Sequence, residues 1–142
     1  MSSGSQSQLC FIDTNIWLYA FIPSQDANKS TKAKTIIQQQ EIIISAQVIN
    51  EVCVNLIKKA QFDELMIRQL IDSFYNKYRI MVIEREVLLK SSELRERLQI
   101  SYWDSLIVSS ALLGSADVLY TEDMSDGIVI ENRLRIINPF ST

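Results

Sequence analysis

The sequence predicts an α/β fold: a single domain in which a mostly parallel five-stranded sheet is flanked by helices on both faces. Short apolar runs that resemble buried strands alternate with longer stretches of helical periodicity. Helices separate most of the consecutive strands, which is the order that a parallel sheet requires. The 142 residues contain only three glycines and two prolines, and no repeat, linker or change of composition divides them.

The first strand is expected at residues 9–12, where LCFI forms a continuous apolar run typical of a strand buried on both faces. A cap from Asp13, Thr14 or Asn15 can start the helix that follows over residues 16–20. A polar loop and the start of a second helix come next.

The second strand is expected at residues 41–46, EIIISA. Ser45 is a suitable N-cap for a helix over residues 46–60, which ends in two lysines that suit the negative end of the helix dipole. An amphipathic helix over residues 63–77 then leads to the third strand, RIMVI, at residues 79–83.

A charged amphipathic helix is expected over residues 86–99, followed by a more apolar helix that ends at Gly114. The fourth strand is DVLYT at residues 117–121, and a fifth is expected within residues 128–138 around LRII. The tryptophans at positions 17 and 103 could serve a dimer, a partner or the core.

Composition excludes several classes of protein. No histidine is present, which removes Ser-His and Cys-His nucleophilic chemistry and almost all zinc chemistry. Cys10 and Cys53 have no CxxC neighbour and are expected to pack as reduced, buried side chains. The net charge of −3, from 17 acids and 14 bases, does not decide the partner.

The polar residues 1–8 are expected to be a disordered tail or an expression remnant, and residues 9–140 the folded domain. No apolar run is long enough for a transmembrane helix, and no positively charged start precedes an apolar segment as in a secretory signal. We therefore expect a cytoplasmic protein.

Acidic residues are the candidates for chemistry. Asp13 directly follows the first strand and Asp123 closely follows the fourth, so both are expected at the carboxyl edge of a parallel sheet. Asp104 heads the apolar stripe of its helix, although a first-turn acid that favours the helix dipole is the simpler alternative. Glu51, in the helix after the second strand, could reach the same edge or be a solvated partner of Lys58.

Several carboxylates cannot share a pocket as bare anions, because their repulsion would protonate some of them or unfold the site. A divalent cation resolves the conflict, and oxygen ligands without histidine or cysteine favour Mg²⁺ or Mn²⁺. Such cations can activate water for in-line attack on a phosphodiester. The pattern therefore indicates metal-dependent phosphodiester hydrolysis.

Four segments, in this order, resemble a PIN domain, and most closely the VapC-type ribonuclease toxins of toxin–antitoxin systems. They are FIDTN at residues 11–15, NE at 50–51, WDSLIVSSA at 103–111 and YTED at 120–123. The likeness extends over almost the whole chain.

The resemblance implies a metal site formed by Asp13, Glu51, Asp104 and Asp123, and cleavage of RNA supported by Mg²⁺ or Mn²⁺. It further implies a homodimer and a cognate antitoxin that blocks the site. The positions that would orient carboxylates or touch substrate are Thr14, Asn15 and Thr121. The peripheral candidates for the fourth acidic position are Glu122 and Asp126.

Other functions are open at this point. A non-catalytic PIN-like domain that binds RNA or protein would keep the acids as a structural cluster. A phosphatase with an aspartyl nucleophile needs a second aspartate where this chain has Asn15, and a receiver domain needs an acidic pair near the first strand.

Overall fold

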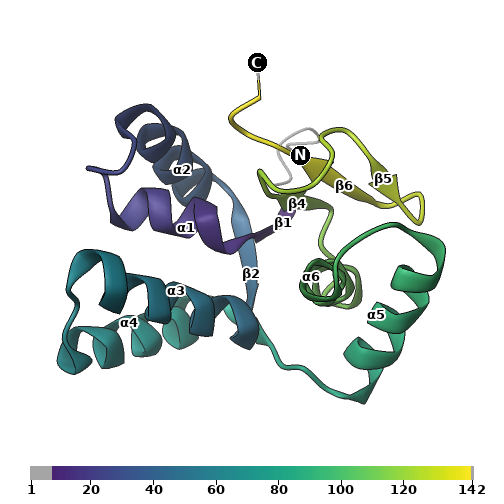
Figure 1. Ribbon diagram of the computed structural model, residues 1–142, viewed down its shortest axis with the longest axis horizontal. Helices are drawn as coiled ribbons and strands as arrows, with labels where there is room; N and C mark the ends of the chain where they lie inside the picture. The colour runs from purple at the N-terminus through teal and green to yellow at the C-terminus, as the bar shows by residue number, and fades with distance from the viewer. Residues whose placement is uncertain (1–7, 142) are drawn as a thin grey trace, which may run out of the picture.

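The computed structural model describes residues 8–141, and in it one mixed sheet lies between layers of helices (Figure 1). The elements in chain order are β1 (Leu9–Ile12), α1 (Thr14–Phe21), α2 (Ala27–Gln39), β2 (Glu41–Ser45), α3 (Ala46–Ala60), α4 (Glu64–Lys77), β3 (Arg79–Met81), α5 (Arg85–Arg97), α6 (Tyr102–Leu113), β4 (Val118–Tyr120), β5 (Val129–Ile130) and β6 (Leu134–Ile137). The polar tail expected at residues 1–8 lies outside the described residues, apart from Gln8.

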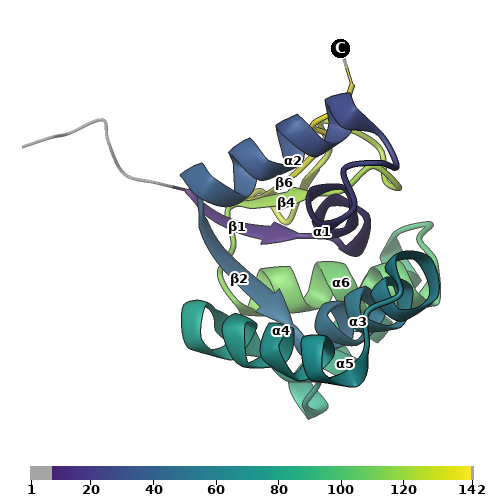
Figure 2. The same ribbon diagram turned by 90° about the vertical axis from the view of Figure 1, so that its left-hand side faces the viewer.

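The strand order is β3-β2-β1-β4-β6-β5, and every pair is parallel except β5 with β6. Helices α2 and α6 lie on opposite sides of the strands (Figure 2). The α/β prediction is therefore confirmed, with six strands instead of the five expected. The additional strand has only two residues and forms a hairpin with β6 through a turn in which Glu131 and Asn132 have positive φ, and so short an element has no readable periodicity.

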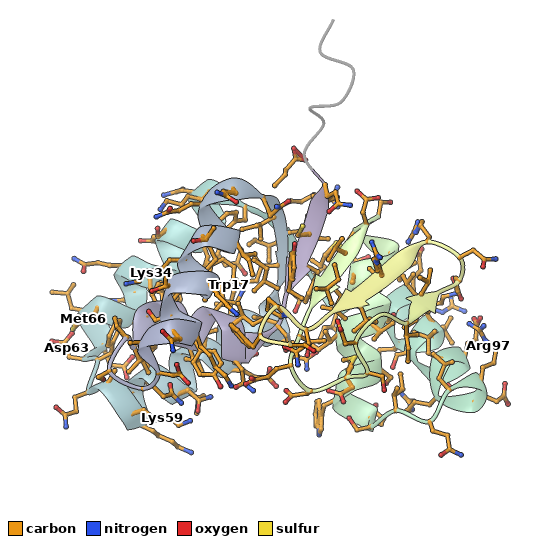
Figure 3. The ribbon with its side chains drawn as sticks, turned by 90° about the horizontal axis from the view of Figure 1, so that it is seen from above. Trp17, Lys34, Lys59, Asp63, Met66 and Arg97 are labelled. Carbon is orange, nitrogen blue, oxygen red and sulfur yellow. The ribbon has the colours of Figure 1, made fainter. Side chains whose placement is uncertain are left out.

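The core is formed by apolar runs that the sheet buries on both faces. Phe11 and Ile12 of β1 and Ile44 of β2 have no exposed surface. Trp17 belongs to this core, since it is 2% exposed and lies edge-on to Phe74 of α4 with ring centroids 5.1 Å apart. Figure 3 shows Trp17 inside the molecule, whereas Asp63 and Arg97 lie at its periphery.

Three parallel strands end side by side at the centre of the sheet. In β1 and β4, Ile12 pairs with Tyr120, so the residues that follow both strands emerge at one edge. β2 is parallel to β1 on the other side, and α3 begins directly after it. Among residues 8–141, no helix combines the length and the apolar character needed to cross a membrane.

Gly114 follows the last residue of α6, as the sequence predicts. A glycine is needed there because space is lacking for a side chain, and not because of the backbone conformation. Its φ of −79° is accessible to any residue. A Cβ built at this position would overlap with Ile43 Cδ1 and lie 3.2 Å from Met81 Sδ and 3.1 Å from the Ser110 carbonyl oxygen. The end of α6 therefore packs directly against β2.

We expect Gly114→Ala to destabilise the protein by about 1–3 kcal/mol, because the added methyl overpacks this contact. Ile43→Val removes the methyl that the new Cβ meets. The double variant should therefore lose less stability than the sum of the two single variants, measured by urea unfolding. Additive losses would contradict the proposed steric cause.

Candidate active site

Asp13 connects β1 to α1 and is held by donors on both of its carboxylate oxygens. Asp13 is at the N-cap position of α1, and its Oδ1 accepts a hydrogen bond from the backbone nitrogen of Thr14, the first helical residue, at 2.8 Å. Its Oδ2 accepts from the Thr121 hydroxyl at 2.8 Å. The residue is only 8% exposed. The end of β1 therefore presents a buried carboxylate in a fixed orientation.

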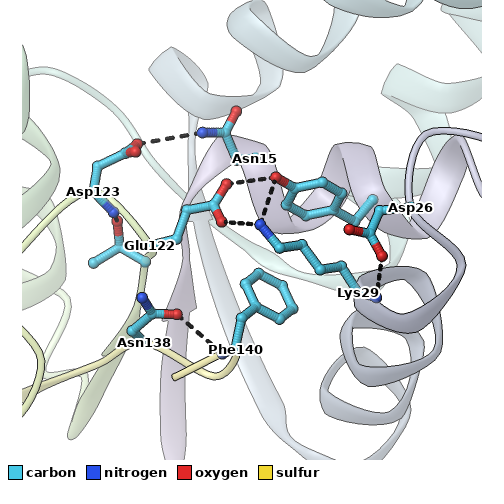
Figure 4. Close-up of polar contacts among 9 residues, drawn as sticks. Asn15, Asp26, Lys29, Glu122, Asp123, Asn138 and Phe140 are labelled. Atoms are coloured by element: carbon cyan, nitrogen blue, oxygen red, sulfur yellow. Dashed lines mark hydrogen bonds and ion pairs between the residues drawn. The ribbon is translucent and has the colours of Figure 1, made fainter. Parts of the chain in front are cut away.

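Thr121 joins Asp13 to Asp123. The threonine is fully buried just after β4, and its backbone nitrogen donates to the Ile137 carbonyl of β6. Its hydroxyl oxygen also accepts a hydrogen bond from the Asp123 backbone nitrogen at 3.2 Å. The Asp123 carboxylate in turn accepts from the Asn15 amide at 3.3 Å (Figure 4).

Glu51 approaches from α3. Ser45, the last residue of β2, caps this helix by accepting from the Val48 backbone nitrogen, as its sequence predicts. The Thr14 hydroxyl donates to Glu51 Oε1 at 2.7 Å. Thr14 therefore contacts Asp13 through its backbone and Glu51 through its side chain, and it bridges two of the candidate acids.

Asp104 is in the first turn of α6, which Ser101 caps by accepting from the Asp104 backbone nitrogen at 3.1 Å. Ile107, Val108 and Ala111, on the same side of this helix, are buried. Asp104 itself is half-buried, at the solvent end of that stripe.

These four acids line one pocket of about 270 Å³, and none of the side chains that line it is positively charged. The complete lining is Asp13, Thr14, Asn15, Gln47, Glu51, Asn55, Trp103, Asp104, Ile107 and Asp123. The structure thus brings together all four acids singled out in the sequence, with Thr14 and Asn15, while Thr121 lies beneath them.

Negative charge accumulates in this pocket without compensation. The pKa of Asp13 is raised from 3.8 to about 6, chiefly by burial and further by the charges of Asp123 and Glu51, although the hydrogen bonds from Thr14 and Thr121 oppose the increase. The pKa of Asp123 is also raised, by partial burial and by the charges of Glu122 and Asp104. A cation would relieve this repulsion.

The acids surround the pocket without forming a tight cage. Within residues 8–141, no group of three or more acidic or cysteine side chains is close enough to share one metal ion. Magnesium does not require such a cage, because it is commonly bound by one or two carboxylates together with waters and substrate phosphates. The donor set therefore fits Mg²⁺ or Mn²⁺ bound by few protein ligands.

The peripheral candidates Glu122 and Asp126 do not line the pocket. Glu122 accepts a hydrogen bond from the Tyr19 hydroxyl at 2.6 Å and forms an ion pair with Lys29 at 2.9 Å (Figure 4). Asp126 accepts from the Asn138 backbone nitrogen at 2.7 Å, next to the end of β6. Both carboxylates are engaged in holding the loop after β4.

Gln47, Asn55, Trp103 and Ile107 also line the pocket, and the sequence did not single them out as site residues. Helical spacing offered a signal for two of them, since Gln47 and Asn55 lie one turn before and one turn after Glu51. Trp103 is adjacent to Asp104 and is 63% exposed.

The comparisons with known proteins agree with this architecture. The sequence profile of the PIN domain matches residues 10–125. A toxin–antitoxin complex from Klebsiella pneumoniae superposes with a TM-score of 0.70 at 20% identity, covering 94% of this chain and 99% of the other. No curated protein matches the chain.

Two further solved structures are similar in fold. VapBC2 from Rickettsia felis, bound to a DNA fragment from its promoter, gives a TM-score of 0.62 at 23% identity and covers 92% of this chain and 99% of its own. VapC20 from Mycobacterium tuberculosis, described as a Sarcin-Ricin loop cleaving toxin, gives a TM-score of 0.62 at 14% identity. The match covers 80% of this chain and 91% of VapC20.

Asp13→Asn is expected to change how stability depends on pH when no metal is present. Because the folded-state pKa of Asp13 lies above its unfolded value, the unfolded chain loses this proton first as the pH rises, and stability falls between about pH 4 and pH 6. The variant should therefore match the wild type near pH 3.5 and be more stable by about 2–3 kcal/mol at pH 7.5.

Urea unfolding in EDTA at both pH values measures this difference. Asp63→Asn is the matched control, because Asp63 is also an N-cap carboxylate, at the exposed start of α4. If Asp13→Asn changes stability equally at both pH values, burial of its charge is not the cause.

Proposed function

The chain belongs to the PIN domain family, and we propose that it is a metal-dependent endoribonuclease and the toxin of a VapC-type toxin–antitoxin pair. The proposal depends above all on one observation: Asp13, Glu51, Asp104 and Asp123 line a single pocket whose lining contains no positively charged side chain. Such a pocket favours a divalent cation, and phosphodiester hydrolysis is the chemistry that cations bound by carboxylates commonly assist.

Bound Mg²⁺ or Mn²⁺ would supply positive charge that offsets the carboxylates and stabilises the charge that develops on the phosphate. Asp13, which Thr14 and Thr121 fix in one orientation, is the central ligand, and Asp104 and Asp123 complete the acidic wall. Asn15 orients Asp123 through its amide.

Glu51 is the proposed proton acceptor for the attacking water. The Thr14 hydroxyl occupies Oε1 of Glu51, which leaves Oε2 to accept a proton. The water oxygen then forms a bond to phosphorus as the bond to the leaving ribose oxygen breaks. The leaving oxygen takes up a proton from solvent water, and Glu51 returns its proton to solvent. Overall, one water molecule is added across one phosphodiester bond.

The partners follow from the same proposal. The similar folds belong to proteins described as toxin–antitoxin complexes, one of them from Klebsiella pneumoniae and one from Rickettsia felis. We propose that this chain likewise acts on RNA, forms a homodimer and binds a cognate antitoxin that blocks the pocket. The proposed location is the cytoplasm, where RNA and an antitoxin would both be available.

A non-catalytic PIN-like domain that binds RNA or protein is the alternative function. The spacing of the acids favours it, since no three of them within residues 8–141 are close enough to share one ion. The two functions differ in a direct test: overexpression of the wild type and of Asp13→Asn, followed by growth measurement and mapping of RNA ends. Growth arrest with new RNA ends in the wild type alone supports the nuclease, whereas arrest without new ends supports the binding domain.

Mn²⁺ is expected to stabilise the folded protein, by about 2.7 kcal/mol when its concentration is 100 times its dissociation constant. The effect should shrink as the pH falls below about 6, because protonated Asp13 no longer attracts the cation. Thermal unfolding with and without Mn²⁺ at pH 5 and pH 7.5 measures it. Asp13→Asn should lose this response and Asp126→Asn should keep it; an equal response in both variants would locate the cation elsewhere.

Glu51→Gln is expected to lower kcat for RNA cleavage by about 10²–10⁴-fold, the usual contribution of a general base. The substitution keeps the acceptor for the Thr14 hydroxyl, so stability should change little. Asp126→Asn, which also retains its backbone hydrogen bond, is the control and should cleave at the wild-type rate. A Glu51→Gln enzyme with full kcat would exclude Glu51 as the proton acceptor.

A further inference from the structure

The side-chain amide of Gln47 is buried in the wall of the acidic pocket without a hydrogen-bond partner. Gln47 is 9% exposed, and neither Oε1 nor Nε2 makes a hydrogen bond within the part of the chain that the structure describes. Buried polar groups are nearly always paired, because an unpaired donor or acceptor loses its hydration without compensation. Both atoms are also shielded from solvent, so the amide reaches a ligand when its side chain turns towards the pocket that Gln47 lines.

The other amides of the pocket differ from Gln47. Asn15 donates to the Asp123 carboxylate, and Asn55 donates to the backbone carbonyl of Glu51. Both are used to hold parts of the protein in place. Gln47 is thus the amide in the pocket lining that the protein does not use.

The position of Gln47 identifies the part of a ligand that it can reach. It is the second residue of α3, one helical turn before Glu51, and both side chains line the pocket. The first turn of a helix has free backbone N–H groups and the positive end of the helix dipole, which favour anions. Gln47 thus lies where the positive end of α3 meets a pocket of carboxylates.

We propose that the Gln47 side chain turns into the pocket when RNA binds and holds the scissile phosphate, with Nε2 donating a hydrogen bond to a non-bridging phosphate oxygen. This inference depends on the proposed nuclease function. A phosphate that enters a pocket with four carboxylates needs donors, and a lysine or arginine would instead pair with those carboxylates and displace the cation. A neutral amide supplies the donor without neutralising the metal ligands. Oε1 then faces water that enters with the substrate.

The proposal predicts that stability and activity respond to Gln47 in opposite directions. Gln47→Met keeps the length of the side chain and removes the unpaired amide. In the absence of metal and RNA, we expect its melting temperature to rise by about 2 °C or more, since a buried unsatisfied group is removed. With Mn²⁺, kcat/KM for an oligoribonucleotide should fall by about 10- to 100-fold, as for a lost hydrogen bond to a charged group.

Two further variants make the comparison specific. Gln69→Met, at an exposed position of α4, is the matched control and should leave both quantities unchanged. Gln47→Glu keeps the size of the side chain but replaces the donor with a negative charge, so it should reduce kcat/KM more than Gln47→Met at neutral pH. The thermal response to Mn²⁺ should persist in Gln47→Met, because the amide binds phosphate and not the cation.

The possible results separate this inference from the function on which it depends. If the wild type cleaves RNA and Gln47→Met cleaves it equally well, the inference is wrong and the nuclease function stands. A lowered melting temperature in Gln47→Met would give the amide a structural role and also overturn the inference. If the wild type does not cleave RNA while Mn²⁺ is bound, the proposed function fails, and the inference fails with it.

Discussion

Repulsion among carboxylates is the constraint around which this site is arranged. Asp13, Glu51, Asp104 and Asp123 share one pocket, and the pKa values of Asp13 and Asp123 are raised first by burial and further by the neighbouring negative charges. The protein holds Glu51, Asp13 and Asp123 with neutral donors, which are the hydroxyls of Thr14 and Thr121 and the amide of Asn15. Hydroxyl and amide donors fix orientation without cancelling charge, so the attraction for a cation is preserved.

Lys29 does not line the pocket, because its ammonium is engaged by other groups. Lys29 of α2 pairs with Glu122 and bonds the Tyr19 hydroxyl, and the same ammonium lies 4.9 Å from the centre of the Tyr19 ring. This contact joins α1, α2 and the loop after β4, and it leaves Asp123, the next residue, facing the pocket. One ion pair thus anchors the loop that carries Asp123 and engages the ammonium of Lys29.

The sequence was sufficient to predict where a residue lies when a local rule determines its position. Asp13 and Asp123 follow parallel strands, so their common edge could be predicted from strand direction alone, and Ser45 was recognisable as a cap. The strand β5 was missed because two residues carry no periodicity. Gln47 was missed because an amide in a helix is ordinary until the tertiary structure buries it without a partner. The pairing of Glu122 with Lys29 spans 93 residues, a distance over which sequence pattern carries no information.

The two tryptophans of this chain occupy opposite environments. Trp17 is 2% exposed and is surrounded by Phe21, Phe74 and Tyr78, whereas Trp103 is 63% exposed at the rim of the acidic pocket. Indole emission depends on polarity and on stacked neighbours, so the buried ring gives a constant blue-shifted signal and the rim ring a red-shifted one that changes with its surroundings. The protein therefore contains its own optical reporter of pocket occupancy, with an internal reference in the core.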